Sequence, residues 1–138
     1  MRLPLALATA LFLAGCGTIT YNIRSSPIAA GSDAVIKAEI NEGQKQTALE
    51  IAIVNLPPPD RVQAEATVFV AWQRKDQTSQ WSRLGLLDYD ADARSGGIKA
   101  TAPEIAFDFE ITAEKTGDAA SPSADVVFSQ RVSQDTAP

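Results

Sequence analysis

The sequence has 138 residues, of which 45% are hydrophobic and 21% are charged, and its formal net charge is −5 at neutral pH. A chain of this length is long enough for one domain and too short for two. Its negative balance, without a basic cluster, argues against binding to nucleic acid and against docking on anionic lipid by charge. Because the sequence contains no histidine, a Ser-His-Asp triad, a His-ligated metal centre and His acid-base catalysis are excluded.

The N-terminus has the three parts of a secretion signal: a positive start, an uncharged run from Leu3 to Leu13, and two small residues before Cys16. The apolar run is shorter than the about 20 residues that a membrane-spanning helix needs. The stretch LAGC, which ends at Cys16, resembles the lipobox of bacterial lipoproteins. This resemblance implies that residues 1–15 are a signal peptide and that the Cys16 thiol carries a diacylglycerol. The alternative is a plain secretion signal with Cys16 near the cleavage site by coincidence.

Acylation of Cys16 would anchor the protein without a transmembrane helix, because two acyl chains suffice for stable membrane binding. Gly17 follows the cysteine, whereas an Asp at that position favours the inner membrane in lipoproteins of the enterobacterial type. The expected location is therefore the bacterial cell envelope, with the outer membrane facing the periplasm favoured. With its one thiol acylated, the chain has no free cysteine for nucleophilic catalysis or for a disulfide.

Residues 16–32 are predicted to be the lipidated cysteine followed by a flexible tether, because they are rich in Thr, Ser, Gly and Ala and contain Pro27. The β-forming residues from Thr18 to Ile23 leave open a first strand at the domain edge. The domain itself is predicted over residues 33–133. Residues 134–138 are expected to be a disordered tail.

Alternating apolar and polar residues predict strands throughout the domain. The runs 34–40 and 47–54 flank a polar turn and are expected to pair antiparallel. The alternation is clearest over 105–112. The run 66–72 is apolar on both faces, which is typical of a central strand. The prolines at 57–59 cannot lie inside a sheet, so they are predicted to cross between two sheets.

About seven short strands without a convincing helix indicate an all-β fold, an antiparallel β-sandwich of the immunoglobulin or fibronectin kind. A small Greek-key fold closed on itself fits the same pattern almost as well. In either fold, the apolar core has to provide the stability, because no disulfide is expected.

The middle and end of the chain also suggest a family. A strand that ends in tryptophan is followed by a Gly-containing strand and later by a Glu, a turn, a proline and an apolar strand. The corresponding residues are Trp72, Gly85, Glu114, Gly117, Pro122 and Val126 to Phe128. This succession resembles the extracytoplasmic domain of anti-sigma-K factors, which implies an extracytoplasmic β-sandwich. Sigma-factor inhibition does not carry over, because the sigma-binding helices of that family have no counterpart here.

Two groups of residues suggest binding chemistry. Asp88, Asp90 and Asp92 alternate in a predicted loop, and carboxylates arranged in this way can converge on a calcium ion; the alternative is a solvated acidic hairpin. Trp81 and Tyr89 flank this region and could form a platform for a carbohydrate or a peptide, although such aromatic residues also serve in packing.

The function expected from the sequence is that of a non-catalytic, membrane-anchored envelope lipoprotein whose β-sandwich binds or scaffolds another envelope component, with a protein as partner. The alternative is a small ligand- or calcium-binding sensor or carrier that uses residues 88–92. No cofactor is expected beyond the covalent lipid.

Overall fold

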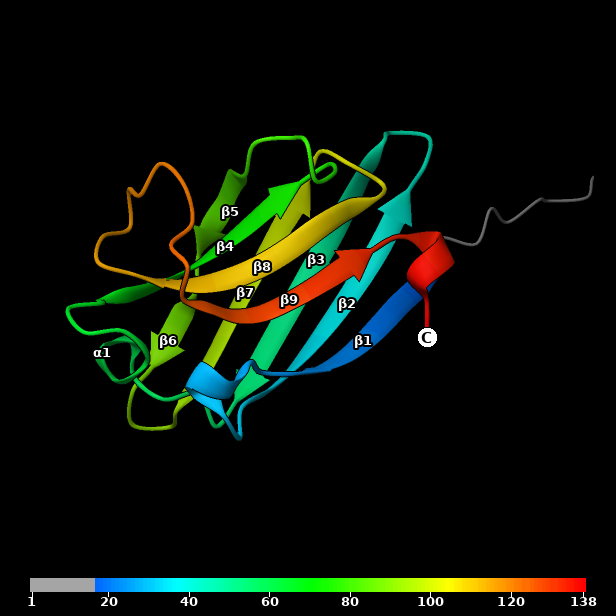
Figure 1. Cartoon of the computed structure of the whole chain (residues 1–138). Coiled ribbons are helices and arrows are strands. Elements are labelled where there is room, and N and C mark those ends of the chain that lie inside the picture. The colour runs from blue at the N-terminus through cyan, green and yellow to red at the C-terminus, as the bar shows by residue number, and fades with distance from the viewer. Residues whose placement is uncertain (1–16) are drawn as a thin grey trace, which may run out of the picture.

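The computed structural model describes residues 17–138, which form two packed antiparallel sheets (Figure 1). Sheet A has the strand order β1-β2-β3-β7-β6, and sheet B has the order β5-β4-β8-β9. The strands are β1 (Thr18–Arg24), β2 (Asp33–Asn41), β3 (Gln46–Val54), β4 (Val68–Arg74), β5 (Ser82–Leu86), β6 (Asp88–Asp90), β7 (Ser95–Ala102), β8 (Phe107–Glu114) and β9 (Val126–Val132). The short helices are η1 (Pro27–Ala29), α1 (Pro59–Val62) and η2 (Gln134–Thr136).

The predicted antiparallel β-sandwich is confirmed, and its two separate sheets decide against the closed Greek-key alternative. Nine strands are present within residues 17–138, instead of about seven, because β1 and β6 add to those predicted. None of the helices in this part of the chain is long and apolar enough to cross a membrane. The signal peptide and Cys16 lie outside the described residues.

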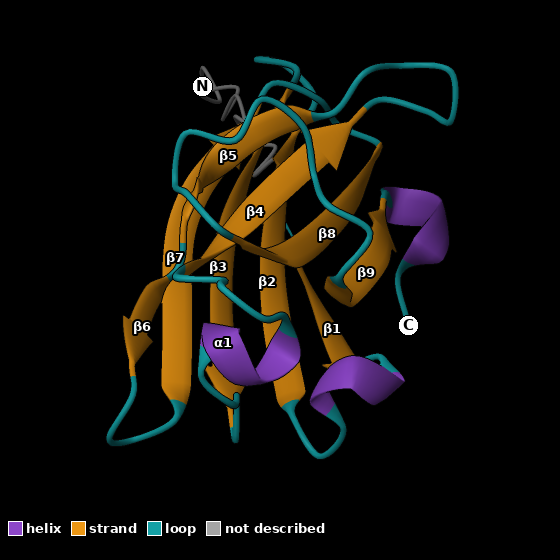
Figure 2. Cartoon of the chain, turned by 60° about the vertical axis from the view of Figure 1, so that its left-hand side comes forward, coloured by secondary structure: helices purple, strands orange, loops and turns teal. Residues whose placement is uncertain are grey.

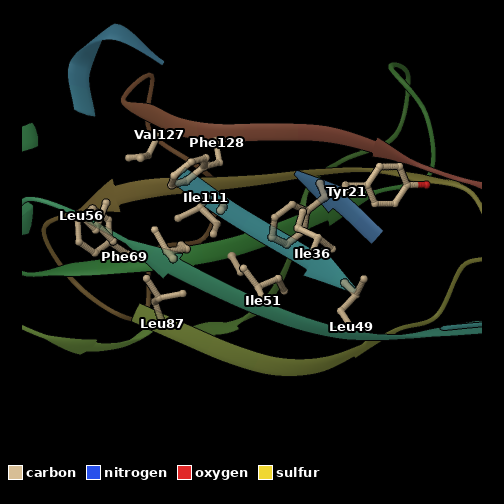
Figure 3. Close-up of a cluster of buried hydrophobic side chains, with 14 of the residues drawn as sticks. Tyr21, Ile36, Leu49, Ile51, Leu56, Phe69, Leu87, Ile111, Val127 and Phe128 are labelled. Atoms are coloured by element: carbon tan, nitrogen blue, oxygen red, sulfur yellow. The ribbon is translucent and has the colours of Figure 1, made fainter. Parts of the chain in front are cut away.

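The hairpin of β2 and β3 shows how the alternation builds the core. Ile36 pairs with Ile51, and both side chains are buried and point toward sheet B (Figure 3). Their neighbours Lys37 and Glu50 also pair, and their side chains lie on the opposite, exposed face. A period of two therefore gives sheet A one buried face and one exposed face.

The proline segment crosses between the sheets as predicted. It connects β3 of sheet A to β4 of sheet B through α1. Leu56, directly before the prolines, is fully buried in the core. Figure 3 shows Leu56 close to Phe69 of β4, so this crossing contributes to the core.

The prediction of a flexible tether over 16–32 is wrong from Thr18 onward, and the first strand that the β-forming residues left open is present. β1 pairs with β2 along its whole length, from Thr18 opposite Glu39 to Arg24 opposite Asp33. Tyr21 is only 3% exposed. The following segment is held as well, because the Ser26 amide donates to the Val127 carbonyl oxygen at 2.8 Å. Small polar residues suggested a tether, but here Ser26 donates to β9, and Ser25 and Ser32 donate to the carbonyl oxygens of Ala29 and Asn55.

The prediction of a disordered tail over 134–138 is also wrong for residues 134–136, which form η2. The Ser133 side chain accepts a hydrogen bond from the Thr136 amide at 3.2 Å. The Tyr21 hydroxyl donates to the Ser133 carbonyl oxygen at 2.9 Å. The sandwich thus extends over 18–136 instead of 33–133, and β1 and the end of the chain hold each other in place.

Candidate functional site

The outer face of sheet B, which points away from the core between the sheets, is closed over part of its area. Trp72 of β4 lies on this face and yet has 0% exposure. Its indole Nε1 donates to Thr112 Oγ1 at 2.8 Å, and the Thr112 hydroxyl donates to Glu114 Oε1 at 2.5 Å. Glu114 also accepts from the Ser123 amide at 2.7 Å. These groups form a buried hydrogen-bonded chain outside the main core.

The cover over this face is the loop between β8 and β9, residues 115–125, which we call the covering loop. Figure 2 shows it in front of β4 and β8. Arg83 of β5 donates to the Gly117 carbonyl oxygen. A Cβ at Gly117 would lie 3.0 Å from a methyl group of Leu86, so the loop packs directly on β5. Ser123 Oγ donates to the Ala113 carbonyl oxygen at 3.0 Å, which fixes the other end of the loop.

Charged side chains on the outer face of sheet B form salt bridges with one another. Asp108 accepts from Arg74 Nε at 3.0 Å and from Arg131 Nη1 at 3.1 Å. The Arg74 guanidinium lies over the Trp81 ring, 4.4 Å from its centroid. Burial raises the pKa of Glu110 above its ordinary value, and the neighbouring carboxylates of Asp108 and Glu114 add to this. The charged side chains on this face therefore mainly bind one another.

The outer face of sheet A is open. Lys37, Glu50 and Lys99 lie side by side on β2, β3 and β7, because Lys37 pairs with Glu50 and Glu50 pairs with Lys99. We call these three residues the charged row. All three are exposed, and none of the ion pairs formed within residues 17–138 involves them. Their charges are available to a partner.

Two shallow hollows lie on either side of the charged row. The first is about 430 Å³ and is bordered by Thr18, Glu39, Ala48 and Thr101. The second is about 560 Å³ and is bordered by Asp88, Asp90, Ser95 and Gly97. The outer face of sheet A is flat beside the charged row, because the side chains there are small or absent at Ala48, Ala52 and Gly97. The backbone of a partner could therefore approach the sheet closely.

The three carboxylates predicted as calcium ligands are not gathered around one point. Asp88 and Asp90 lie on the exposed face of β6, and Asp92 lies in the turn after it. Asp90 Oδ1 accepts from the amides of Asp92 and Ala93 at 3.0 and 3.1 Å. Across residues 17–138, no group of three or more acidic or cysteine side chains could hold a metal ion. Asp90 thus stabilises the β6–β7 turn, and no cluster of calcium ligands is preformed.

Trp81 and Tyr89 do not form one platform. Tyr89 points inward from β6, its hydroxyl donates to the Leu56 carbonyl oxygen at 2.7 Å, and its ring meets the Phe69 ring edge-on at 5.4 Å. Burial raises the pKa of Tyr89. Trp81 instead packs against Arg74. Because Phe69 and Arg74 lie near opposite ends of β4, the two aromatic residues are far apart and both serve mainly in packing.

Comparisons of the chain with protein-family models, with curated proteins and with solved structures find no match. The resemblances to the lipobox and to the anti-sigma-K extracytoplasmic domain therefore stay predictions. Sequence reasoning missed the charged row, although Lys37 and Glu50 each occupy an outward position of a predicted strand. The missing information was the pairing of β3 with β7, which are more than 40 residues apart.

Proposed function

We propose that this protein is a lipid-anchored protein of the bacterial cell envelope whose β-sandwich has no catalytic role and binds another envelope protein through the outer face of sheet A. The observation that carries this proposal is the difference between the two outer faces. The chain covers part of the face of sheet B with its own loop and forms salt bridges there, whereas the charged row of sheet A is exposed and takes part in none of the salt bridges within residues 17–138. The lipobox-like stretch ending at Cys16 supports the anchor and a location at the outer membrane, facing the periplasm.

The chemistry of this face suits recognition more than catalysis. The charged row presents the signs plus, minus, plus across three neighbouring strands, and charge patterns of this kind select partners with the complementary pattern. The residues around the row are hydroxyl-bearing, small or acidic, with Glu39 at one hollow and Asp88 and Asp90 at the other. The low hollows beside the row would admit an extended or flat surface, so a protein segment with alternating charges is the partner that fits best.

The strand order supports an immunoglobulin-like fold. If β2, β3, β7 and β6 are strands A, B, E and D, and β5, β4, β8 and β9 are strands C′, C, F and G, both sheets have the immunoglobulin order. β1 is then an additional strand beside A. Trp72 lies on strand C, where immunoglobulin domains carry a buried tryptophan, but here it packs under the covering loop instead of between the sheets.

The proposal can be tested with a photo-crosslinking amino acid at Ala52, on the outer face of sheet A, and at Ser129, on the outer face of sheet B. Both positions are exposed. In cells that make the lipidated protein, we expect one discrete protein adduct from position 52 and none from position 129. The substitution Ala48→Arg, which places a bulky charge beside the charged row, should abolish the adduct.

Equal adducts from both positions, or an adduct from position 52 that survives Ala48→Arg, would contradict binding through this face. Fractionation of the same cells tests the anchor independently. The acylated protein should remain with membranes, and a Cys16→Ser variant should be released.

A further inference from the structure

The first strand begins very close to the predicted lipid. Gly17 is the only residue between Cys16 and Thr18, where β1 starts. Consecutive Cα atoms are about 3.8 Å apart, and the extended chain advances at most about 3.6 Å per residue. The Cα atoms of Cys16 and Thr18 are therefore at most about 7 Å apart. The lipid would therefore be attached almost directly to the folded domain.

The start of β1 is held in the fold by pairing and by a buried side chain. Thr18 pairs with Glu39, and six further pairs continue along β1 to Arg24. The side chain of Tyr21 is buried, and its hydroxyl donates a hydrogen bond to the carbonyl oxygen of Ser133. The start of β1 cannot leave sheet A without breaking these contacts, so the anchor would join one defined end of the sandwich.

This end of the sandwich, which we call the anchor end, contains the start of β1, the β2–β3 turn and η2 (Figure 1). The opposite end contains α1, η1 and the β6–β7 turn. β2 runs from one end to the other, and its nine residues span about 30 Å at 3.3 to 3.4 Å per residue. The two ends are therefore much farther apart than the distance that the connection through Gly17 can span.

Charge does not account for the approach of this end to a membrane. Its acidic side chains outnumber its basic ones when the adjoining β4–β5 turn is included: Glu39, Glu42, Asp76, Glu104, Asp108 and Asp135 against Lys45, Arg74, Lys75 and Arg131. An anionic lipid surface would attract basic side chains, so electrostatic attraction would not hold this end against the lipid. The short covalent connection is the feature that brings it there.

We propose that acylated Cys16 holds the sandwich end-on, with the anchor end against the lipid headgroups and with α1 and the β6–β7 turn directed away from the membrane. This inference rests on the lipid anchor of the proposed function. Sheet A then stands upright on the bilayer, and its outer face is accessible to a partner along its full height.

The test uses the lipidated protein in phosphatidylcholine vesicles that contain a lipid with a spin label on its headgroup. Acylation blocks Cys16, so one introduced cysteine can be labelled selectively with a fluorophore. Gly43→Cys places the label in the β2–β3 turn, where a Cβ would meet only Asn41 Oδ1 at 3.5 Å. Ala93→Cys places it in the exposed β6–β7 turn. We expect the label at 43 to lose most of its emission and the label at 93 to keep it.

A flexible Gly/Ser segment of about 15 residues, inserted between Gly17 and Thr18, spans roughly 20 Å as a coil and should remove the difference between the two labels. Equal quenching at 43 and 93 without the insertion, in vesicles that still carry the protein on flotation, would overturn the end-on orientation and leave the anchor intact. Absence of the protein from floated vesicles, together with a mass that lacks the lipid, would overturn both proposals.

Discussion

The outer face of sheet B is partly closed by the chain itself, whereas the outer face of sheet A is open along its length. Both faces arise from the same two-residue alternation. On β4, however, both sets of alternating side chains are apolar, and Trp72 would be exposed without further cover. On β3 the inward set is large and apolar, and the outward positions hold Ala48, Glu50 and Ala52, with Val54 at the end of the strand.

The difference shows how a loop of small polar residues can create a second buried layer. The covering loop supplies the Ser123 amide to Glu114, and Glu114 in turn accepts from Thr112, which holds the Trp72 indole. Burying polar groups is costly unless they are hydrogen-bonded. Here each member of the chain has a partner, so sheet B gains a satisfied polar layer where sheet A keeps a free surface.

The largest expected effect is the difference in stability loss between a substitution under the covering loop and one on the open face of sheet A. Trp72→Ala removes a fully buried indole and its hydrogen bond, and we expect a loss of about 3–5 kcal/mol in the free energy of unfolding. Val54→Ala on the outer face of sheet A, where Val54 is 52% exposed, should change it by no more than about 0.5 kcal/mol. Urea unfolding followed by circular dichroism measures both. Similar losses in the two variants would mean that the covering loop does not make a second packed layer.

A smaller effect is expected from the carboxylate under the loop. Glu114→Ala leaves the Thr112 hydroxyl and the Ser123 amide without their acceptor, which should cost about 1–3 kcal/mol. Glu50→Ala in the charged row removes an exposed carboxylate and should stay within about 0.5 kcal/mol. Amide hydrogen exchange supplies a local measurement, because the Ser123 amide should lose protection in Glu114→Ala. Unchanged protection would show that Glu114 does not hold the loop.

The smallest effect concerns the half-buried Glu110. Its pKa is raised in the folded state, so the folded protein binds more protons than the unfolded chain between the ordinary and the raised pKa. Stability contributed by this group should therefore increase as the pH falls through that window. Glu110→Gln should remove this increase and leave the rest of the pH dependence unchanged.

The difference in unfolding free energy between the wild-type protein and Glu110→Gln, measured at several pH values, isolates this contribution. Asp76, whose pKa is lowered to about 2 mainly by hydrogen bonds from Thr78, loses its stabilising effect as the pH falls, but it does so in both proteins. A difference that does not vary with pH would contradict the assignment to Glu110.

The sequence by itself determined an all-β antiparallel fold and favoured the sandwich, and the two separate sheets of the structure decided against the closed Greek-key fold. The alternation over 34–40, 47–54 and 105–112 specifies which side chains are buried, because neighbouring residues of a strand point to opposite faces. The run that ends at Trp72 is apolar on both faces, which predicted a central strand covered on one side and partly sheltered on the other. The prolines at 57–59 marked a crossing between the sheets, because they cannot donate to a sheet ladder.

Only the tertiary structure decided that Thr18 begins a strand, that the covering loop buries Trp72, and that Lys37, Glu50 and Lys99 form one row. The segment 16–32 as a whole has the composition of a tether, although Thr18 to Ile23 are β-forming. The membership of β1 in sheet A depends on β2 and on the backbone of Ser133, which is 112 residues from Tyr21. Local patterns report which face a residue occupies. They carry no information about which distant strand or loop lies against that face, because the hydrogen bonds and contacts that decide this are made between segments far apart in the chain.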